Sequence, residues 1–248
     1  MDTDPAMLRL LAVIPARGGS KGIPRKNVKE FLGRPLLAWT VDVAKASKVF
    51  ERVIVSTDDQ DIAAIGRACG AEVPFLRPGY LAEDTAPTAP VIHHAVDWLH
   101  RKEQWLPDFV MVLEPTSPSR RIFHLQAAAR LLRDSGADSL ASVSTLPHHY
   151  HPAKALRLHS DGGLTGVDGT PVREMRYRRQ DLPDLYAFNG LIFAAKTSLL
   201  FESPPALWGK RVIGYVTAPQ YSIDIDMPED WVTAEARMEA ILAEETAQ

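Results

Sequence analysis

The chain alternates short apolar runs with amphipathic segments along most of its length. Apolar runs of strand length fall at residues 9–14, 52–57, 71–75, 108–114 and 138–145. Segments with apolar side chains at helical spacing fall at residues 34–47, 58–70, 89–104 and 124–136. Strands without polar alternation are typical of a parallel sheet that is covered on both faces. The pattern therefore predicts an α/β fold of three layers, with a doubly wound and mostly parallel sheet.

The alternation stops at residues 147–185. This segment is rich in histidine, glycine and proline and has only short apolar pieces, at 155–158 and 171–175. It predicts a small antiparallel lobe inserted into a single domain that spans residues 1–248. Strand patterns return at 186–196 and 211–217, and a last helix is expected from about residue 228. Within the first half, Thr116, Ser117 and Pro118 are expected to begin the helix at 124–136.

Composition narrows the classes of function. The net charge is -3, so no overall basic field indicates a nucleic-acid partner. No apolar run reaches the roughly 18 residues that cross a bilayer. The N-terminal residues lack the pattern of a signal peptide, and Cys69 is the only cysteine, which excludes an internal disulfide. We expect a cytoplasmic protein with no membrane partner.

Basic and glycine residues are concentrated directly after the first predicted strand, in VIPARGGSKGIPRKN at 13–27. Glycines let the backbone approach a ligand closely, and arginine binds phosphate oxygens in pairs. The loop matches neither the dinucleotide fingerprint nor the P-loop. Its chemistry favours a polyphosphate site, and a solvated loop of charges remains the alternative.

Two acids lie near the C-terminal end, in YSIDIDMPEDW at 221–231. Asp224 and Asp226 are two residues apart on an extended segment, so their side chains share one side. Mg²⁺ is commonly held by one or two carboxylates together with substrate phosphates. The pair therefore indicates a magnesium site, although two solvated acids before a helix that begins near Pro228 would give the same pattern.

These segments carry a resemblance to a known family. The loop at 13–27 is similar to that of CMP-sialic acid synthetases and related nonulosonate cytidylyltransferases. Further similar segments follow in the family's order: VIVSTDDQDIA, FLRPGYLAEDTAPT, VLEPTSPSR, RRQDLPDLYAFNG and SIDIDMPED. The resemblance covers about residues 10–232.

The resemblance implies an enzyme that transfers CMP from CTP to a nonulosonic acid and releases pyrophosphate. By motif, the catalytic residues are Arg17 and Lys26 on the triphosphate and Asp224 and Asp226 on Mg²⁺. The implied nucleotide-binding residues are Ala16, Arg17, Ser20, Lys26, Asn27, Arg77 and Thr88. No general base is evident in the sequence.

The implied sugar-binding residues are Glu114, Arg179, Gln180, Tyr186, Asn189 and Gly190. Glu114 departs from the family, whose sialic-acid members typically carry glutamine there. A carboxylate only accepts hydrogen bonds, whereas an amide also donates them. We therefore expect a substrate other than N-acetylneuraminate. In relatives the lobe at 147–185 is exchanged across a homodimer, so the resemblance also implies a dimer.

Other functions fit the sequence less well. A Kdo synthetase is the nearest alternative, and nucleotidyltransferases of sugar 1-phosphates usually carry a G-x-G-T-R loop that is absent here. The DID triplet resembles the DxD motif of metal-dependent glycosyltransferases, which normally lies in mid-chain. A non-catalytic nucleotide-binding module is the third alternative. The histidines at 148–151 have no second ligand cluster, which favours a polar loop over a metal site.

Overall fold

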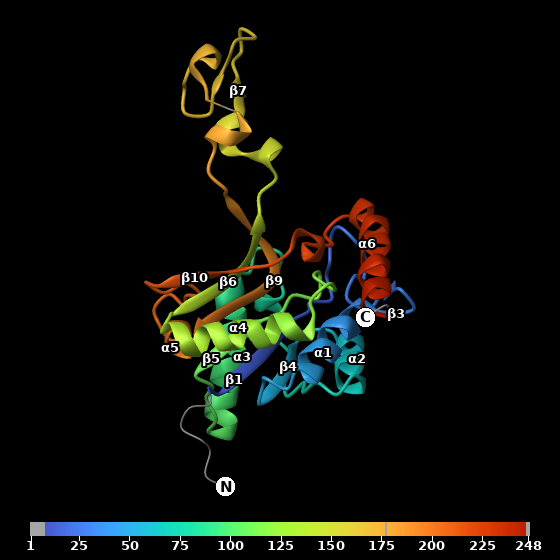
Figure 1. Ribbon diagram of the computed structural model, residues 1–248. Helices are drawn as coiled ribbons and strands as arrows, with labels where there is room; N and C mark the ends of the chain where they lie inside the picture. Colours follow the sequence, from blue (N-terminus) through green and yellow to red (C-terminus); the bar gives the residue numbers. More distant parts are fainter. Residues whose placement is uncertain (1–7, 177, 247–248) are drawn as a thin grey trace.

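The computed structural model describes residues 8–176 and 178–246. A six-stranded sheet with the order β10-β6-β9-β5-β1-β4 forms its centre (Figure 1). Its strands are β1 (Leu10–Pro15), β4 (Arg52–Ser56), β5 (Phe109–Val112), β6 (Ser139–Thr145), β9 (Tyr186–Lys196) and β10 (Val212–Val216). β1 is parallel to β4 and β5, and β10 is parallel to β6, while β9 is antiparallel to both of its neighbours. The sheet is mostly parallel, as the sequence predicts.

Helices cover both faces of this sheet (Figure 1). The helices are α1 (Leu36–Ser47), α2 (Gln60–Ala68), α3 (Thr88–Glu103), α4 (Ile122–Ser135), α5 (Thr197–Leu200) and α6 (Pro228–Thr246). One apolar core joins α1, α2 and α4 to one face, and a second joins α3 and α5 to the other. These are the three layers expected from the alternation of strands and helices.

A third core holds the C-terminal helix beside the basic loop. Trp231 and Met238 of α6 pack with Ile23 and with Phe31, which lies in the short antiparallel pair β2 (Glu30–Phe31) and β3 (Arg34–Pro35). Burial of large apolar and aromatic side chains stabilises this contact. It therefore brings the end of the chain against the loop that follows β1.

Two expectations about local structure are wrong. Residues 71–75 form no strand of the sheet, because Glu72 makes only a single parallel bridge to Ile54. The helix expected to begin from Thr116 and Ser117 begins at Ile122 instead. The backbone N–H of Arg121 donates to Nδ1 of His124 at 3.0 Å, so a histidine inside the helix caps its first turn.

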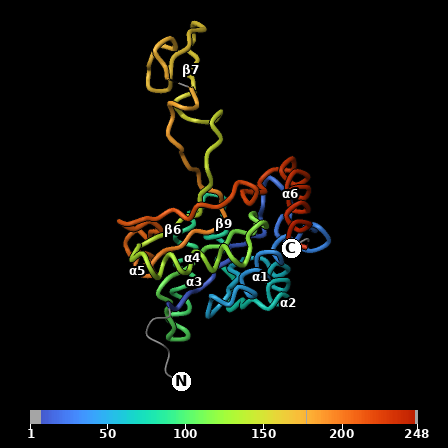
Figure 2. The backbone as a smooth tube through the Cα atoms, viewed as in Figure 1, coloured from blue at the N-terminus to red at the C-terminus, as the bar shows by residue number. Residues whose placement is uncertain are grey.

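Between β6 and β9 the chain forms an arm that stands away from the sheet (Figure 1). The chain runs out and back along itself, as the tube in Figure 2 shows, and carries the antiparallel pair β7 (Leu156–Leu158) and β8 (Leu164–Gly166). Leucines on this pair are exposed, Leu158 by 72%. Among the helices of the described residues, none has the length and apolar character needed to cross a bilayer.

Candidate active site

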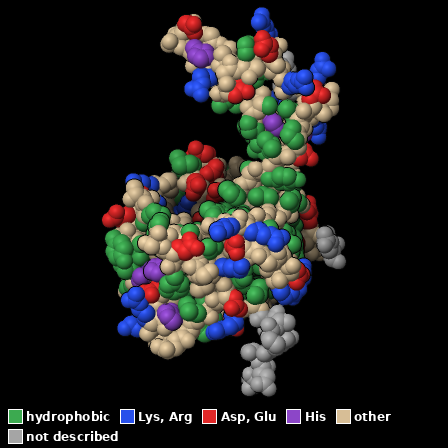
Figure 3. Space-filling model, turned by 90° about the vertical axis from the view of Figure 1, so that its left-hand side faces the viewer, with side chains coloured by type: hydrophobic (Ala, Val, Ile, Leu, Met, Phe, Trp, Pro, Cys, Tyr) green, Lys and Arg blue, Asp and Glu red, His purple; other side chains and the backbone are tan. Residues whose placement is uncertain are grey.

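Neighbouring parallel strands direct their carboxyl ends to one edge of the sheet, where ligands bind in open α/β folds. The basic loop follows β1, the acids Asp58 and Asp59 follow β4, and Glu114 follows β5. This edge is hollowed below the arm, and acidic side chains gather there in Figure 3.

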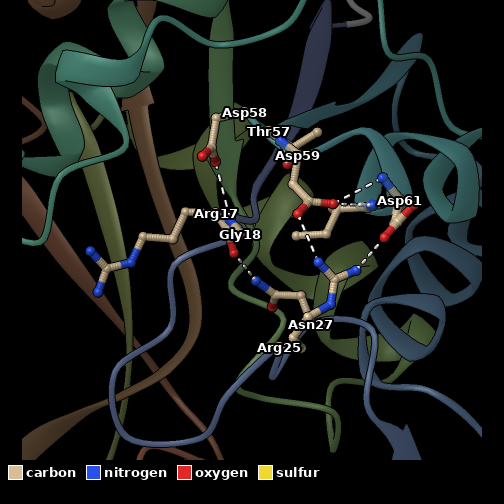
Figure 4. A network of polar contacts seen from close by, with 9 residues as sticks. Arg17, Gly18, Arg25, Asn27, Thr57, Asp58, Asp59 and Asp61 are labelled. Atoms are coloured by element: carbon tan, nitrogen blue, oxygen red, sulfur yellow. Dashed lines mark hydrogen bonds and ion pairs between the residues drawn. The ribbon is translucent and has the colours of Figure 1, made fainter.

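The basic loop is fixed by polar contacts to the turn after β4 (Figure 4). The N–H of Gly18 donates to Asp58 at 3.1 Å, and the guanidinium of Arg25 contacts Asp59 at 3.0 Å and Asp61 at 2.6 Å. Asp59 also accepts two N–H bonds at the start of α2, so the loop is anchored to a helix N-terminus. The side chain of Arg17 points away from this network (Figure 4), so it is free to make a different contact.

The loop also meets the acid pair directly. Lys26 Nζ donates to the carbonyl oxygen of Ile225 at 2.6 Å and to Asp226 Oδ1 at 3.0 Å, across 199 and 200 positions of sequence. Gly22 lies so close that a Cβ there would be 2.2 Å from the carbonyl oxygen of Asp226. Only glycine permits this approach, and it brings the basic loop and the acids into one site.

The acid pair is held from behind. The N–H of Ile225 donates to the carbonyl oxygen of Thr116 at 3.0 Å, and the Thr116 hydroxyl bonds the carboxylate of Asp224. Asp224 is open to the cleft on one side and shielded by protein on the other. This burial, with Asp226 as a second cause, raises the pKa of Asp224 above its usual value. Two carboxylates that repel one another offer a favourable position for a cation.

A cleft of about 550 Å³ lies between these segments. It is lined by Arg17, Ser20, Lys21, Lys26, Asn27, Arg77, Asp84, Thr88, Glu114, Thr116, Asp224 and Asp226, among others. The cleft is therefore lined both by cations of the loop and by carboxylates, some of which pair with one another. Such a cleft suits a polyanion that a cation accompanies.

Asp84 holds the exposed cations of the loop. Its two carboxylate oxygens lie 2.5 Å from Arg17 Nη1 and 2.5 Å from Lys21 Nζ. The bond from Lys21 is the main reason that the pKa of Asp84 lies below its usual value. The carboxylate thus takes the position in which an anionic ligand would meet the same two side chains.

A second cavity of about 800 Å³ adjoins the cleft. The two share Thr88, Glu114 and Asp224 in their linings. Asn189 and Gly190 lie in the second cavity beside an aromatic wall, in which Phe188 stacks on Trp208 at 5.7 Å between ring centroids. Burial, with Asp224 as the next cause, raises the pKa of Glu114.

All but one of the residues that were expected to bind the nucleotide lie in the lining of the cleft. Ala16 is fully buried in the core, and its N–H donates to the carbonyl oxygen of Ser56. Asn27 is buried and donates to the carbonyl oxygen of Arg17 at 3.0 Å, which shapes the loop. Arg77 is buried and donates to the carbonyl oxygens of Ser56 and Leu81, at 3.1 and 3.2 Å, and burial lowers its pKa.

The residues expected at the sugar divide into two groups. Glu114, Asn189 and Gly190 lie in the second cavity. Arg179 and Gln180 line a separate hollow on the arm, with His148, Leu182 and Asp184. Tyr186 is exposed at the start of β9 and lines neither the cleft nor the second cavity. A single chain therefore does not bring Arg179 and Gln180 to the acid pair.

Several residues of the site are not predicted from the sequence. Asp58 and Asp59 anchor the loop, Asp84 pairs with its cations, Thr116 holds Asp224, and Trp208 forms the wall of the second cavity. The adjacent acids after β4 were a signal, because they lie at the same sheet edge as the loop. The sequence around Trp208 carries no comparable signal.

Comparisons with known proteins identify similar chains. A family model described as cytidylyltransferase matches residues 11–97. The chain is 35% identical to a CMP-N,N'-diacetyllegionaminic acid synthase of Legionella pneumophila, over 94% of this chain and 97% of that one. It is 40% identical to a pseudaminic acid cytidylyltransferase of Campylobacter jejuni, over 79% of this chain and 82% of that one. It is 35% identical to N-acylneuraminate cytidylyltransferase A of Danio rerio, over 92% of this chain but 50% of that longer one.

Solved structures share the fold at lower identity. A CMP:2-keto-3-deoxy-manno-octonic acid synthetase complexed with CTP superimposes with a TM-score of 0.67 at 17% identity, over 94% of this chain and 99% of that one. A 4-diphosphocytidyl-2C-methyl-D-erythritol synthase of Anaerococcus prevotii gives a TM-score of 0.61 at 14% identity, with the same coverage. At such identities the likeness concerns the arrangement of the elements.

Proposed function

The chain belongs to the cytidylyltransferase family, and from that premise we propose that it transfers CMP from CTP to the anomeric hydroxyl of a nonulosonic acid and releases pyrophosphate. One observation carries this proposal: a cleft with a basic loop and an acid pair opens into a second cavity through Glu114 and Asp224. CTP fits the charged cleft and the acid fits the second cavity. The α-phosphorus and the attacking hydroxyl would then meet at their junction.

Catalysis of such a transfer depends mainly on positioning and on stabilising charge. Arg17 and Lys26 would bind the triphosphate and stabilise the departing pyrophosphate. Ser20, Asn27, Arg77 and Thr88 line the same cleft and would hold the nucleotide. Ala16 would contribute only through its backbone, because its side chain is in the core.

Asp224 and Asp226 fit a magnesium ion. Both carboxylates line the cleft, and Thr116 and Lys26 orient them. Within residues 8–176 and 178–246, no group of three or more His, Cys, Asp or Glu side chains is placed to hold a metal ion. The phosphates of CTP and water would therefore complete the coordination, as is common for Mg²⁺. When bound, the ion supplies polarisation of the phosphate oxygens.

We also propose that the protein acts as a homodimer. The arm exposes leucines on β7 and β8, and Arg179 and Gln180 lie away from the cleft of their own chain. Docking of the arm on a second copy would cover the leucines and bring Arg179 near the sugar carboxylate of that copy. Arginine chelates carboxylates well. A cytoplasmic location stays a prediction.

The test is turnover by the purified full chain. We would incubate it with Mg²⁺, each of the four ribonucleoside triphosphates, and a panel of N-acetylneuraminate, N,N'-diacetyllegionaminate, pseudaminate and Kdo. Pyrophosphate release that requires both CTP and a nonulosonic acid, with the CMP-sugar detected by mass spectrometry, is the expected result, and EDTA should abolish it. If none of the acids in the panel supports pyrophosphate release, the proposal is contradicted. Release with Kdo alone would favour a Kdo synthetase.

A further inference from the structure

Glu114 lies where the two cavities join. It comes two residues after the end of β5 and is one of the three residues that line both spaces. A side chain at this point faces whatever part of the sugar acid stands nearest to the nucleotide. Its chemistry therefore influences which acid is accepted.

The carboxylate of Glu114 makes no hydrogen bond to any other residue within 8–176 and 178–246. Arg120 is the cation with the larger effect on this carboxylate; it is fully buried, and its Nη2 donates at 3.0 Å to the backbone oxygen of Glu114. Arg120 also contacts the backbone of Leu191 and the hydroxyl of Thr40. Arg120 thus holds the backbone behind the site, and the carboxylate is left to accept a bond from a ligand.

The surroundings of Glu114 keep this acceptor open. Gly190 has a φ of +73°, and a Cβ there would lie 2.9 Å from Ser117 Oγ and 3.9 Å from Glu114 Oε2. Any larger residue would therefore crowd the entrance to the second cavity. Asp224 and Asp226 both face Glu114 with like charge. A ligand that brings a hydrogen-bond donor is favoured here, and one that brings an acceptor is repelled.

The second cavity has an apolar wall beyond this acceptor. Phe188 stacks on Trp208 with an angle of 7° between the rings, and Phe193 packs on Trp208 edge to face. Phe188 is 65% exposed and Trp208 is 43% exposed, so both retain apolar surface that a ligand can cover. Methyl groups of acyl or deoxy substituents gain by burial on such a surface, whereas hydroxyl groups lose their water without a partner.

We propose that Glu114 and the Phe188–Trp208 wall together select nonulosonic acids with acylamido and deoxy substituents over hydroxyl-rich ones. An acylamido group satisfies both features, because its N–H donates to the carboxylate and its methyl covers the aromatic wall. This selection rests on the proposed function. Glu114 is assigned the role of a hydrogen-bond acceptor here, and not that of a base.

The experiment compares kcat/KM for N,N'-diacetyllegionaminate, which carries two N-acetyl groups, with that for N-acetylneuraminate, which carries one. In the wild-type protein we expect kcat/KM to be at least about tenfold higher for the diacetylated acid. One additional buried hydrogen bond and one methyl contact give discrimination of this size. Glu114→Gln should lower this ratio toward one, through a higher KM for the diacetylated acid. The KM for CTP should change less than the KM for the diacetylated acid, because the basic loop and its contacts are unchanged.

Two further variants sharpen the result. Trp208→Ala should also lower the ratio, because it removes the apolar wall without touching the acceptor. Glu244→Gln, an exposed position near the end of α6, is the matched control and should keep the wild-type ratio. A wild-type ratio near one, or an unchanged ratio in Glu114→Gln, would overturn the selection while CTP turnover still supports the proposed function. Absence of turnover with every acid would instead overturn both.

Discussion

At the scale of single residues, one carboxylate contacts the cations of the basic loop that the proposed function assigns to the nucleotide. Asp84 contacts Arg17 and Lys21 at 2.5 Å each, and all three side chains retain access to solvent. Exposed ion pairs of this kind are weak, so a triphosphate can displace the carboxylate. In the proposed reaction, the pair of contacts would keep the two cations near the cleft before CTP binds.

Asp84→Asn should therefore strengthen CTP binding. The amide no longer holds the two cations by charge, so the nucleotide need not displace an anion. We expect the KM for CTP to fall about two- to fivefold, with the KM for the acid unchanged, as initial rates of pyrophosphate release would measure. Asp134→Asn, which removes an exposed partner of Arg133 far along the chain, is the control. A rise in the KM for CTP would show that Asp84 orients the cations rather than competing for them.

At the scale of elements, the site depends on how closely the loop and the acid segment pack. Gly22 lies against the backbone of Asp226, while a Cβ added to Gly19 in the same loop would meet nothing within 4 Å. The same substitution at the two positions therefore separates the effect of losing the close contact with Asp226 from the effect of replacing any glycine in the loop.

Gly22→Ala should lower kcat/KM by about 100-fold. The new methyl would overlap the carbonyl oxygen of Asp226, so the loop must move away and Lys26 loses its position on the acid pair. Gly19→Ala adds the same methyl where nothing lies within 4 Å and should cost far less. Circular dichroism and thermal melting would show that both variants are folded. Equal losses in the two variants would mean that the loop is sensitive to any side chain, not to this contact.

The buried His124 in the first turn of α4 should make the stability of the protein depend on pH. His124 is buried, and burial, with Arg120 and Arg121 as further causes, lowers its pKa to about 3. The unfolded chain binds a proton on this histidine near pH 6.5, whereas the folded protein does not until about pH 3. Its contribution to stability is therefore complete above pH 6.5 and is lost progressively as the pH falls toward 3.

His124→Asn should remove that part of the acid sensitivity. Asparagine can accept the same N–H bond from Arg121 but does not titrate. Below pH 6.5, the free energy of unfolding of the wild type should fall more steeply than that of the variant, by up to about 1.4 kcal/mol per pH unit. Urea denaturation at intervals between pH 7 and 4 would measure the difference. Parallel curves would place the proton on His124 in the folded state as well.

At the scale of the whole molecule, the sequence predicts those helices, strands and motifs that depend on residues close together in the chain. The spacing of apolar side chains predicted α1, α2 and the strands of the sheet, and the two charged motifs were expected to share a ligand. The pairing of β9, antiparallel between β5 and β6, depends on contacts far apart in sequence and left no local pattern. The same holds for the second cavity, because Trp208 reaches Phe188 only through the fold. Residues 71–75 have the pattern of a strand because their apolar side chains pack on the core. They form no strand, because they make a single bridge instead of a ladder of hydrogen bonds.

The arm makes the dimer testable through its chemistry as well as its mass. Arg179 lies on the arm and Asp224 lies in the cleft, so exchange of arms would build each site from two chains. Arg179→Ala and Asp224→Asn should each lose most of the activity as homodimers. A mixed dimer has one site in which both residues are intact and one in which both are changed. Random association should therefore restore about a quarter of the wild-type activity.

The mixture would be made by co-expressing the two variants with different affinity tags, and mixed dimers would be isolated by purification on both tags in turn. These dimers should reach about half of the wild-type activity per dimer, because one of their two sites is complete. Light scattering on the wild type should give twice the mass of the 27.4 kDa chain. If the mixed dimers are as inactive as their parents, Arg179 serves the cleft of its own chain. A wild-type mass of one chain would exclude exchange altogether, and the cleft and second cavity would then have to bind the sugar acid without Arg179.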